Sequence, residues 1–141
     1  MTITKASRSD LGHLLNLARR FHALGPYRDR PFDEDLLTEY LVSFFDRADA
    51  RIYMTNRGAI GMSIESAEVY KTPFVRERFF YAEKGEGAEL LEMLDHFSDQ
   101  NGNLPITLSA LSQDGKDTRL HTRLYGRRGY RVAETTYIKG F

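Results

Sequence analysis

The sequence predicts one α/β domain in which helices pack on a mixed sheet. Its 141 residues match the usual size of a single domain, and its 41% hydrophobic residues are enough for one core. Apolar positions follow a period of two in some segments and a period of three to four in others, which indicates both strands and helices. The order of these segments is β-α-α-β-β-β-α-β-α-β. We therefore expect residues 1–141 to form a single domain.

The first quarter of the chain predicts a strand and two helices. Residues 2–6 alternate apolar and polar side chains, as in a short strand. Ser9 or Asp10 can cap a helix that ends before Gly25-Pro26, and Asp33 can cap the next helix. The apolar faces of the two helices are Leu11, Leu14, Leu15, Ala18 and Phe21, and then Leu36, Leu37, Tyr40, Leu41, Phe44 and Phe45.

A hairpin, a third strand and a helix are expected next. Strands at 51–55 and 59–69 flank Asn56-Arg57-Gly58, which is a hairpin signal, and an aromatic-rich strand follows at 74–82. Gly85-Glu86-Gly87 opens a helix that closes at Asn101-Gly102.

The last part predicts a strand at 105–110, a short basic helix at 118–127 and a final strand at 130–138. If this final strand is exposed, Tyr137 and Phe141 could pack across a homodimer.

Composition excludes several classes of protein. The chain has no cysteine, so thiol nucleophiles, disulfides and thiolate metal sites are excluded. Its 20 basic and 20 acidic residues cancel, so we do not expect nucleic acid to be its partner. No apolar run reaches the ~20 residues needed to span a bilayer, and the N-terminus lacks the layout of a signal peptide. We expect a cytoplasmic protein with no membrane partner.

No metal site is expected. The four histidines, His13, His22, His96 and His121, are far apart in the sequence, and no two have the close spacing of a helical metal site.

Residues 79–91 combine a strand, a glycine-containing turn and a helix start. Gly85 and Gly87 allow a sharp turn just where the free amides and the positive end of a helix dipole can hold a phosphate. An ordinary strand-to-helix turn would give the same pattern.

This segment resembles the acetyl-CoA pyrophosphate loop of the Gcn5-related N-acetyltransferase (GNAT) superfamily, whose pattern is Q/R-x-x-G-x-G/A at a helix start. Residues 124–130, LYGRRGY, resemble the closing signature L-Y-x-x-x-G-F/Y of that superfamily. The order of elements is also similar. The stretches at 21–23, 26–27 and 31–33 resemble small phage-encoded members in particular.

The resemblance implies a mostly antiparallel central sheet with helices on both faces, splayed between its fourth and fifth strands, with acetyl-CoA in the opening. It implies direct acetyl transfer to a primary amine, carried by a small molecule or a protein. Strand backbone for the pantetheine would come from Phe80, Tyr81 and Ala82, and the pyrophosphate would be held by Lys84, Gly85, Glu86, Gly87 and Ala88.

Tyr125 is implied to be the general acid. A phenol of pKa ~10 can protonate the thiolate that leaves when an amine attacks a thioester. The alternative is a tyrosine that only packs on Leu124 and His121.

The incoming amine also needs a base, because it is mostly protonated at neutral pH. Glu77 is the first candidate, since it lies on the strand that would border acetyl-CoA, where partial burial would raise its pKa. Glu65 on the neighbouring strand is the second, and His22 could line the acceptor side. As alternatives, the two acids could be solvated and His22 a packing residue.

The loop is degenerate relative to the family pattern. Ala82 occupies the Q/R position, Lys84 offers one positive charge instead, and Glu86 and Glu89 place acids where the pyrophosphate would lie. The helix dipole favours such acids without any ligand. The second hypothesis is therefore a catalytically inactive GNAT-fold interaction or structural protein, for example a phage virion component bound to other phage structural proteins.

Overall fold

The computed structural model describes residues 2–66, 71–110, 119–134, 137 and 139. Its contacts divide the chain into two compact units. The first consists of Met1–Ala18 and Asp33–Ser109, and the second of Arg19–Phe32 and Ala110–Phe141. The single domain expected from chain length stays a prediction.

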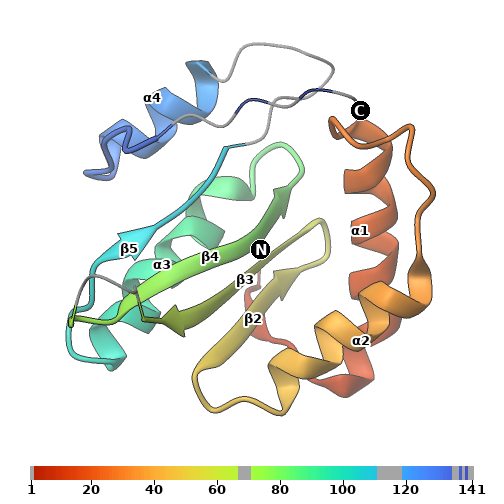
Figure 1. The fold of residues 1–141 in the computed structure, drawn as a ribbon, viewed down its shortest axis with the longest axis horizontal. Helices are drawn as coiled ribbons and strands as arrows, with labels where there is room; N and C mark the ends of the chain where they lie inside the picture. The colour runs from red at the N-terminus through yellow and green to blue at the C-terminus, as the bar shows by residue number, and fades with distance from the viewer. Residues whose placement is uncertain (1, 67–70, 111–118, 135–136, 138, 140–141) are drawn as a thin grey trace. The chain divides into compact units, whose positions relative to one another are not determined.

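The first unit contains a five-stranded sheet with the order β1-β2-β3-β4-β5 (Figure 1). All neighbouring strands are antiparallel except β4 and β5, which are parallel. The mixed, mostly antiparallel sheet is thus confirmed. The strands are β1 Thr4–Lys5, β2 Ala50–Thr55, β3 Gly58–Glu65, β4 Phe74–Ala82 and β5 Ile106–Thr107.

The predicted hairpin between β2 and β3 is present. Thr55 and Gly58 form its last pair, so that Asn56 and Arg57 make the connecting turn. Gly58 is required by packing, because a Cβ there would lie 2.9 Å from the backbone carbonyl oxygen of Tyr81 and 2.7 Å from a methyl carbon of Leu90. The hairpin tip therefore lies close to the helix that follows β4.

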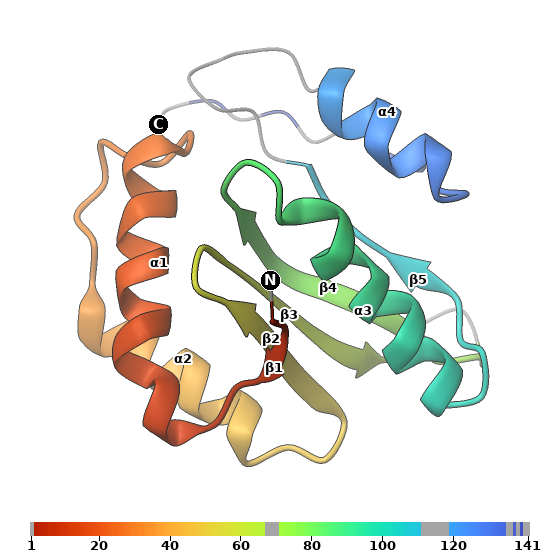
Figure 2. The same cartoon turned by 180° about the vertical axis from the view of Figure 1, so that it is seen from behind.

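Helices cover both faces of this sheet, as expected. The helices that begin or lie within the first unit are α1 Leu11–Leu24, α2 Glu34–Phe45 and α3 Gly87–Gln100. Leu14 of α1 and Phe44 of α2 join one buried cluster with Ile52 of β2. On the other face, α3 buries Leu94 and Phe97 completely or nearly so. Figure 1 shows α3 behind the strands, and Figure 2, from the opposite side, shows it in front of them.

The helix caps agree with the sequence in one case and differ in another. The carboxylate of Asp33 accepts a hydrogen bond from the backbone N–H of Leu36 at 3.0 Å, as predicted. Before α1, however, residues Arg8–Asp10 form a short 3-10 turn, and Ser7 caps it in place of Ser9 or Asp10. The Ser7 backbone N–H donates a hydrogen bond to the Asp10 carboxylate at 2.9 Å, so Asp10 takes part in the capping box as its third residue.

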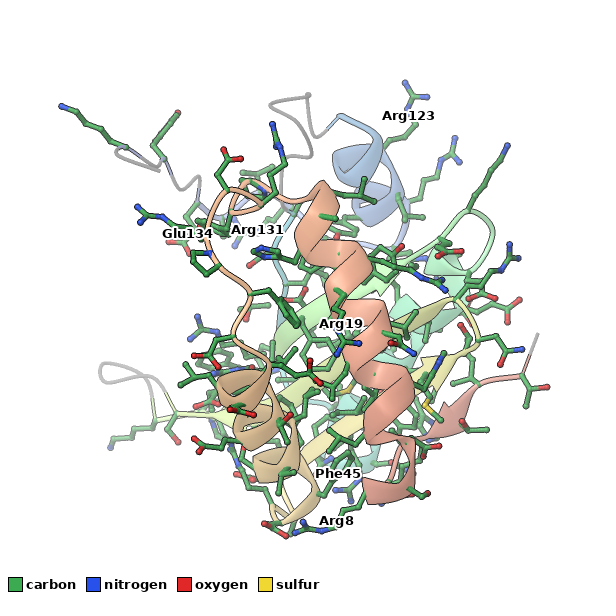
Figure 3. All side chains as sticks on the ribbon, turned by 90° about the vertical axis from the view of Figure 1, so that its right-hand side faces the viewer. Arg8, Arg19, Phe45, Arg123, Arg131 and Glu134 are labelled. Atoms are coloured by element: carbon green, nitrogen blue, oxygen red, sulfur yellow. The ribbon has the colours of Figure 1, made fainter. Side chains whose placement is uncertain are left out.

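An ion pair joins the start of α1 to the end of α2. The guanidinium of Arg8 contacts Asp46, the residue that ends α2. Figure 3 shows Arg8 at that end of the helix, close to Phe45. Both partners are exposed, so we expect the pair to stabilise the fold by at most about 1 kcal/mol.

The second unit contains α4, Arg119–Arg127. The predicted final strand at 130–138 is wrong for residues 130–134, which form no strand, and 135–136, 138 and Phe141 lie outside the described residues. The backbone N–H of Tyr130 instead bonds the carbonyl of Tyr125 at 3.1 Å, and Gly129 has a φ of 89°. These features end a helix, and they use the amide that a strand would need.

Three other predicted strands are shorter than expected. β1 covers only Thr4–Lys5 of the predicted 2–6. β3 ends at Glu65, and residues 67–70 of the predicted 59–69 segment lie outside the described residues. β5 covers only Ile106–Thr107 of the predicted 105–110. Within the described ranges, no helix has the length and apolar character required to cross a membrane.

Candidate functional site

The sheet opens between β4 and β5. The two strands pair only through Val75 with Ile106 and Arg76 with Thr107. β4 continues to Ala82, but no described strand pairs with residues 77–82 on that side. The pairing pattern is that of the splay predicted between the fourth and fifth strands.

A β-bulge lies at the point where β4 separates from β5. Glu77 pairs with Met62 and Phe79 pairs with Gly61, so Arg78 is an extra residue with no partner on β3. Phe79 lies over Gly61, where a Cβ atom would come within 2.2 Å of the phenyl ring. Bulges of this kind redirect side chains and are common next to active sites.

The bulge sends two consecutive side chains toward α2. Arg78 Nε donates to the hydroxyl of Tyr40 at 3.3 Å, and the Phe79 ring meets the Phe44 ring edge-on at 5.7 Å. In a regular strand these side chains would point to opposite faces. Glu77, which precedes the bulge, is paired across the ladder with Met62, which is fully buried.

Glu77 is buried, with only 9% of its surface exposed. Burial raises the pKa of its carboxyl group from 4.5 to about 7, while a hydrogen bond from the Ser109 backbone and the charges of Arg76 and Arg78 oppose this rise. The predicted rise in pKa is therefore confirmed. A carboxyl group with this pKa can accept and return a proton at neutral pH.

Glu65 has a different environment. Its Oε1 atom accepts a hydrogen bond from Ser63 at 2.7 Å and from Arg78 at 3.3 Å, and Arg47 lies 4.0 Å away. This carboxylate is held by cations on the α2 side of the sheet. The arrangement suits a residue that fixes Arg78 better than one that takes up protons.

The turn between β4 and α3 presents open amides. Gly85 has a φ of 94°, and the Glu86 N–H bonds the Glu83 carbonyl at 3.2 Å. The first hydrogen bond of the helix runs from the Leu90 N–H to the Glu86 carbonyl. Within the part of the chain that the structure describes, the backbone N–H groups of Gly87 and Ala88 have no hydrogen-bond acceptor.

The side chain of Glu86 does not point toward these amides, contrary to our expectation from the sequence. It is 6% exposed and accepts hydrogen bonds from the Thr55 hydroxyl and, at 3.2 Å, from the Arg57 backbone N–H. The Arg57 guanidinium lies 3.6 Å from its Oε1 atom. The negative charge of Glu86 is therefore compensated by donors at the β2–β3 turn. The geometry does not support the predicted repulsion between this carboxylate and a pyrophosphate. Lys84 and Glu89 are exposed.

Phe80, Tyr81 and Ala82 form the end of β4 beside this turn. The Phe80 ring lies 3.5 Å from the position that a Cβ atom on Gly87 would take, so it packs against the start of α3. The Tyr81 hydroxyl donates to Glu83 at 3.3 Å. The residues at the end of β4 and in the following turn, which we expect to contact acetyl-CoA, therefore lie next to each other.

Tyr125 belongs to the second unit and is 8% exposed. Its ring lies 6.1 Å from that of Tyr130, and its carbonyl accepts hydrogen bonds from the N–H groups of Arg128 and Tyr130. Its backbone thus closes α4. The role of its hydroxyl as a general acid stays a prediction.

His22, also in the second unit, holds the loop that follows α1. Its Nε2 atom lies 2.8 Å from the Arg30 carbonyl oxygen, and its ring packs on Phe32 at 5.4 Å. This arrangement is that of a packing residue, and its contact with an acceptor stays a prediction. Among the described residues, no three His, Asp or Glu side chains are grouped to hold a metal ion.

No family model matches this chain, and no curated protein matches it either. Several solved structures, in contrast, match this chain. An aminoglycoside 6'-N-acetyltransferase of Acinetobacter haemolyticus is 14% identical, with 100% of this chain and 98% of that chain covered and a TM-score of 0.71. A GNAT family acetyltransferase of Staphylococcus aureus is 21% identical, with 99% and 98% covered and a TM-score of 0.63.

A predicted acetyltransferase of Clostridium acetobutylicum, determined with acetyl-CoA, is 15% identical, with 99% of this chain and 95% of that chain covered and a TM-score of 0.73. At such low identity the likeness concerns the fold. This chain therefore has the fold of the GNAT acetyltransferases.

Proposed function

We propose that this chain is an N-acetyltransferase that transfers the acetyl group of acetyl-CoA directly to a primary amine. The observation that carries the proposal is Glu77, a buried acid with a pKa of about 7 beside the bulge where β4 separates from β5. Perturbed acids of this kind are concentrated at functional sites. The GNAT fold supports the same conclusion.

The residues present fit acetyl-CoA. Two adjacent N–H groups, those of Gly87 and Ala88, lie open at the start of α3, where the helix dipole favours an anion such as a pyrophosphate. The end of β4, residues 80–82, would lie along the pantetheine. Lys84 is exposed in the turn and would add one positive charge. The bound thioester would supply the acetyl group.

Glu77 would make the amine reactive. Near pH 7 about half of this carboxyl group is ionised, so it can take a proton from the ammonium form of the acceptor. The nitrogen then forms a bond to the acetyl carbon as the bond from that carbon to sulfur breaks. Tyr125 would give its proton to the departing sulfur. The acylated nitrogen would lose its second proton to solvent, which would return a proton to Tyr125 and take up the one held by Glu77. The absence of cysteine is consistent with direct transfer.

The acceptor is proposed only as a class. Amines on small molecules are modified by aminoglycoside 6'-N-acetyltransferases, which are among the proteins with this fold. Glu65 and His22 are the residues that we propose near the acceptor. A protein amine would serve the same chemistry.

Thermal unfolding with and without acetyl-CoA tests the proposal. A ligand present at a hundred times its dissociation constant stabilises the native state by about 2.7 kcal/mol, so the melting temperature should rise. Release of free CoA thiol in the presence of a panel of primary amines should then identify an acceptor. No shift at millimolar acetyl-CoA would contradict the proposal and favour a catalytically inactive interaction or structural protein.

A further inference from the structure

We propose that Glu86 is a positioning residue that fixes the start of α3 against the β2–β3 turn and so sets the geometry of the acetyl-CoA site. This inference rests on the proposed function. It assigns to the Glu86 side chain a role that differs from the electrostatic obstacle expected from sequence.

The turn before α3 needs an external anchor. Gly85 and Gly87 flank Glu86, and glycine restricts the backbone less than any other residue. Lys84 and Gly85 are exposed and Glu83 is only half-buried, whereas Glu86 is buried. Among residues 83–88, Glu86 therefore has the most buried side chain.

The anchor point is a hydrogen-bonded hairpin turn. Thr55 is the last residue of β2, and Arg57 lies in the tight hairpin turn that follows. The Thr55 hydroxyl and the Arg57 backbone N–H both donate hydrogen bonds to the Glu86 carboxylate. The Arg57 carbonyl accepts a hydrogen bond from the Glu83 N–H at 2.9 Å. The turn before α3 is therefore attached to the hairpin at both of its ends, Glu83 and Glu86. From α1, His13 Nε2 lies 2.8 Å from the Thr55 carbonyl oxygen.

The position of Glu86 in the chain links this anchor to the ligand. The open N–H groups of Gly87 and Ala88 come immediately after it, and its own carbonyl accepts the first helical hydrogen bond. Fixing its side chain therefore fixes the direction of both amides. Hydrogen bonds to a charged acceptor are roughly twice as strong as neutral ones, so the attachment should persist in solution.

Calorimetric titration with CoA, without an acceptor, tests the role. Glu86→Ala should raise the dissociation constant of CoA at least tenfold, because the amides lose their fixed direction. The matched control is Glu89→Ala, which removes an exposed acid of the same type from the same end of α3. Removing a nearby negative charge should leave that constant unchanged or lower it.

Steady-state kinetics with an identified amine separate positioning from general damage. Glu86→Ala should raise the KM for acetyl-CoA about as much as the dissociation constant, while kcat at saturating acetyl-CoA changes less than threefold. Thr55→Val should weaken CoA binding in the same direction and Thr55→Ser should restore it, because serine keeps the hydroxyl donor. If Glu86→Ala does not fold, the pair of Thr55 variants still tests the proposal.

The outcomes distinguish the two proposals. If the unaltered protein binds CoA and Glu86→Ala binds it equally or more tightly, the carboxylate contributes only charge and the positioning role is wrong. The positioning role also fails if Thr55→Val binds CoA as tightly as the unaltered protein. If the unaltered protein binds no CoA, the proposed function fails, and this inference fails with it.

Discussion

Met62, which is completely buried, lies directly opposite Glu77 in the β3–β4 ladder. The ionised form of a buried carboxyl group lacks the hydration that it has in water, and this desolvation is the largest cause of the raised pKa of Glu77. The neighbouring cations Arg76 and Arg78 only partly compensate.

Stability should therefore depend on pH through Glu77. Its pKa is higher in the native state, so the native state binds more protons than the unfolded state between pH 4.5 and about 7. The free energy of unfolding should fall by about 3 kcal/mol as pH rises through that range. Urea denaturation at several pH values measures the slope. Glu77→Gln should remove it, and Glu89→Gln should retain it; a slope unchanged in Glu77→Gln would contradict the assignment.

Activity should show the opposite dependence on pH. The ionised carboxylate is the base, so kcat/KM should increase with pH around an apparent pKa near 7. Glu77→Gln should lower kcat by about 10²–10⁴-fold and abolish this transition, with CoA affinity retained. Glu65→Gln is the comparison, since Glu65 pairs with Arg78. If Glu65→Gln loses the transition instead, the base has been assigned to the wrong acid.

Tyr125→Phe tests the general acid. The change removes one hydroxyl and keeps the ring that lies beside Tyr130. We expect turnover to decrease and CoA affinity to stay nearly the same, measured by kinetics and calorimetry. Equal losses of turnover and affinity would mean that Tyr125 only packs.

The bulge at Arg78 should be sensitive to the size of residue 61. Gly61→Ala would place a Cβ atom 2.2 Å from the Phe79 ring, so Phe79 must move, and the protein should lose about 1–3 kcal/mol of stability. Gly12→Ala is the control, because a Cβ there meets nothing within 4 Å. It lies in α1, where alanine should stabilise by up to about 1 kcal/mol. Equal effects in chemical denaturation would show that Phe79 does not depend on Gly61.

Local signals in the sequence predicted much of the fold. The cap at Asp33 and the hairpin at Asn56-Arg57-Gly58 depend on neighbouring residues, and both are confirmed. The predicted final strand was wrong for residues 130–134 because a strand also needs a partner. The Tyr130 N–H instead completes the end of α4, a local interaction that the apolar pattern does not reveal.

Only part of the candidate site was predicted, because sequence patterns reveal local interactions and not contacts between distant residues. The raised pKa of Glu77 was predicted because the residue lies on the strand that, by resemblance, would border acetyl-CoA and partly bury it. Its role as the base stays a prediction. The direction of the Glu86 side chain could not be predicted, because its partner Thr55 lies 31 residues away in the sequence. Only the register of the sheet brings the two together, and no short sequence pattern encodes it.

The early end of the β4–β5 ladder also bears on solubility. From Glu77 to Ala82, no described strand covers that edge of β4, and this segment includes the aromatic run at residues 79–81. Uncovered strand edges are templates for association between copies of a protein. A molecule that fills the opening would also shield this edge, so the ligand-free protein should aggregate sooner during concentration than the protein kept with acetyl-CoA, the ligand that we propose for the opening.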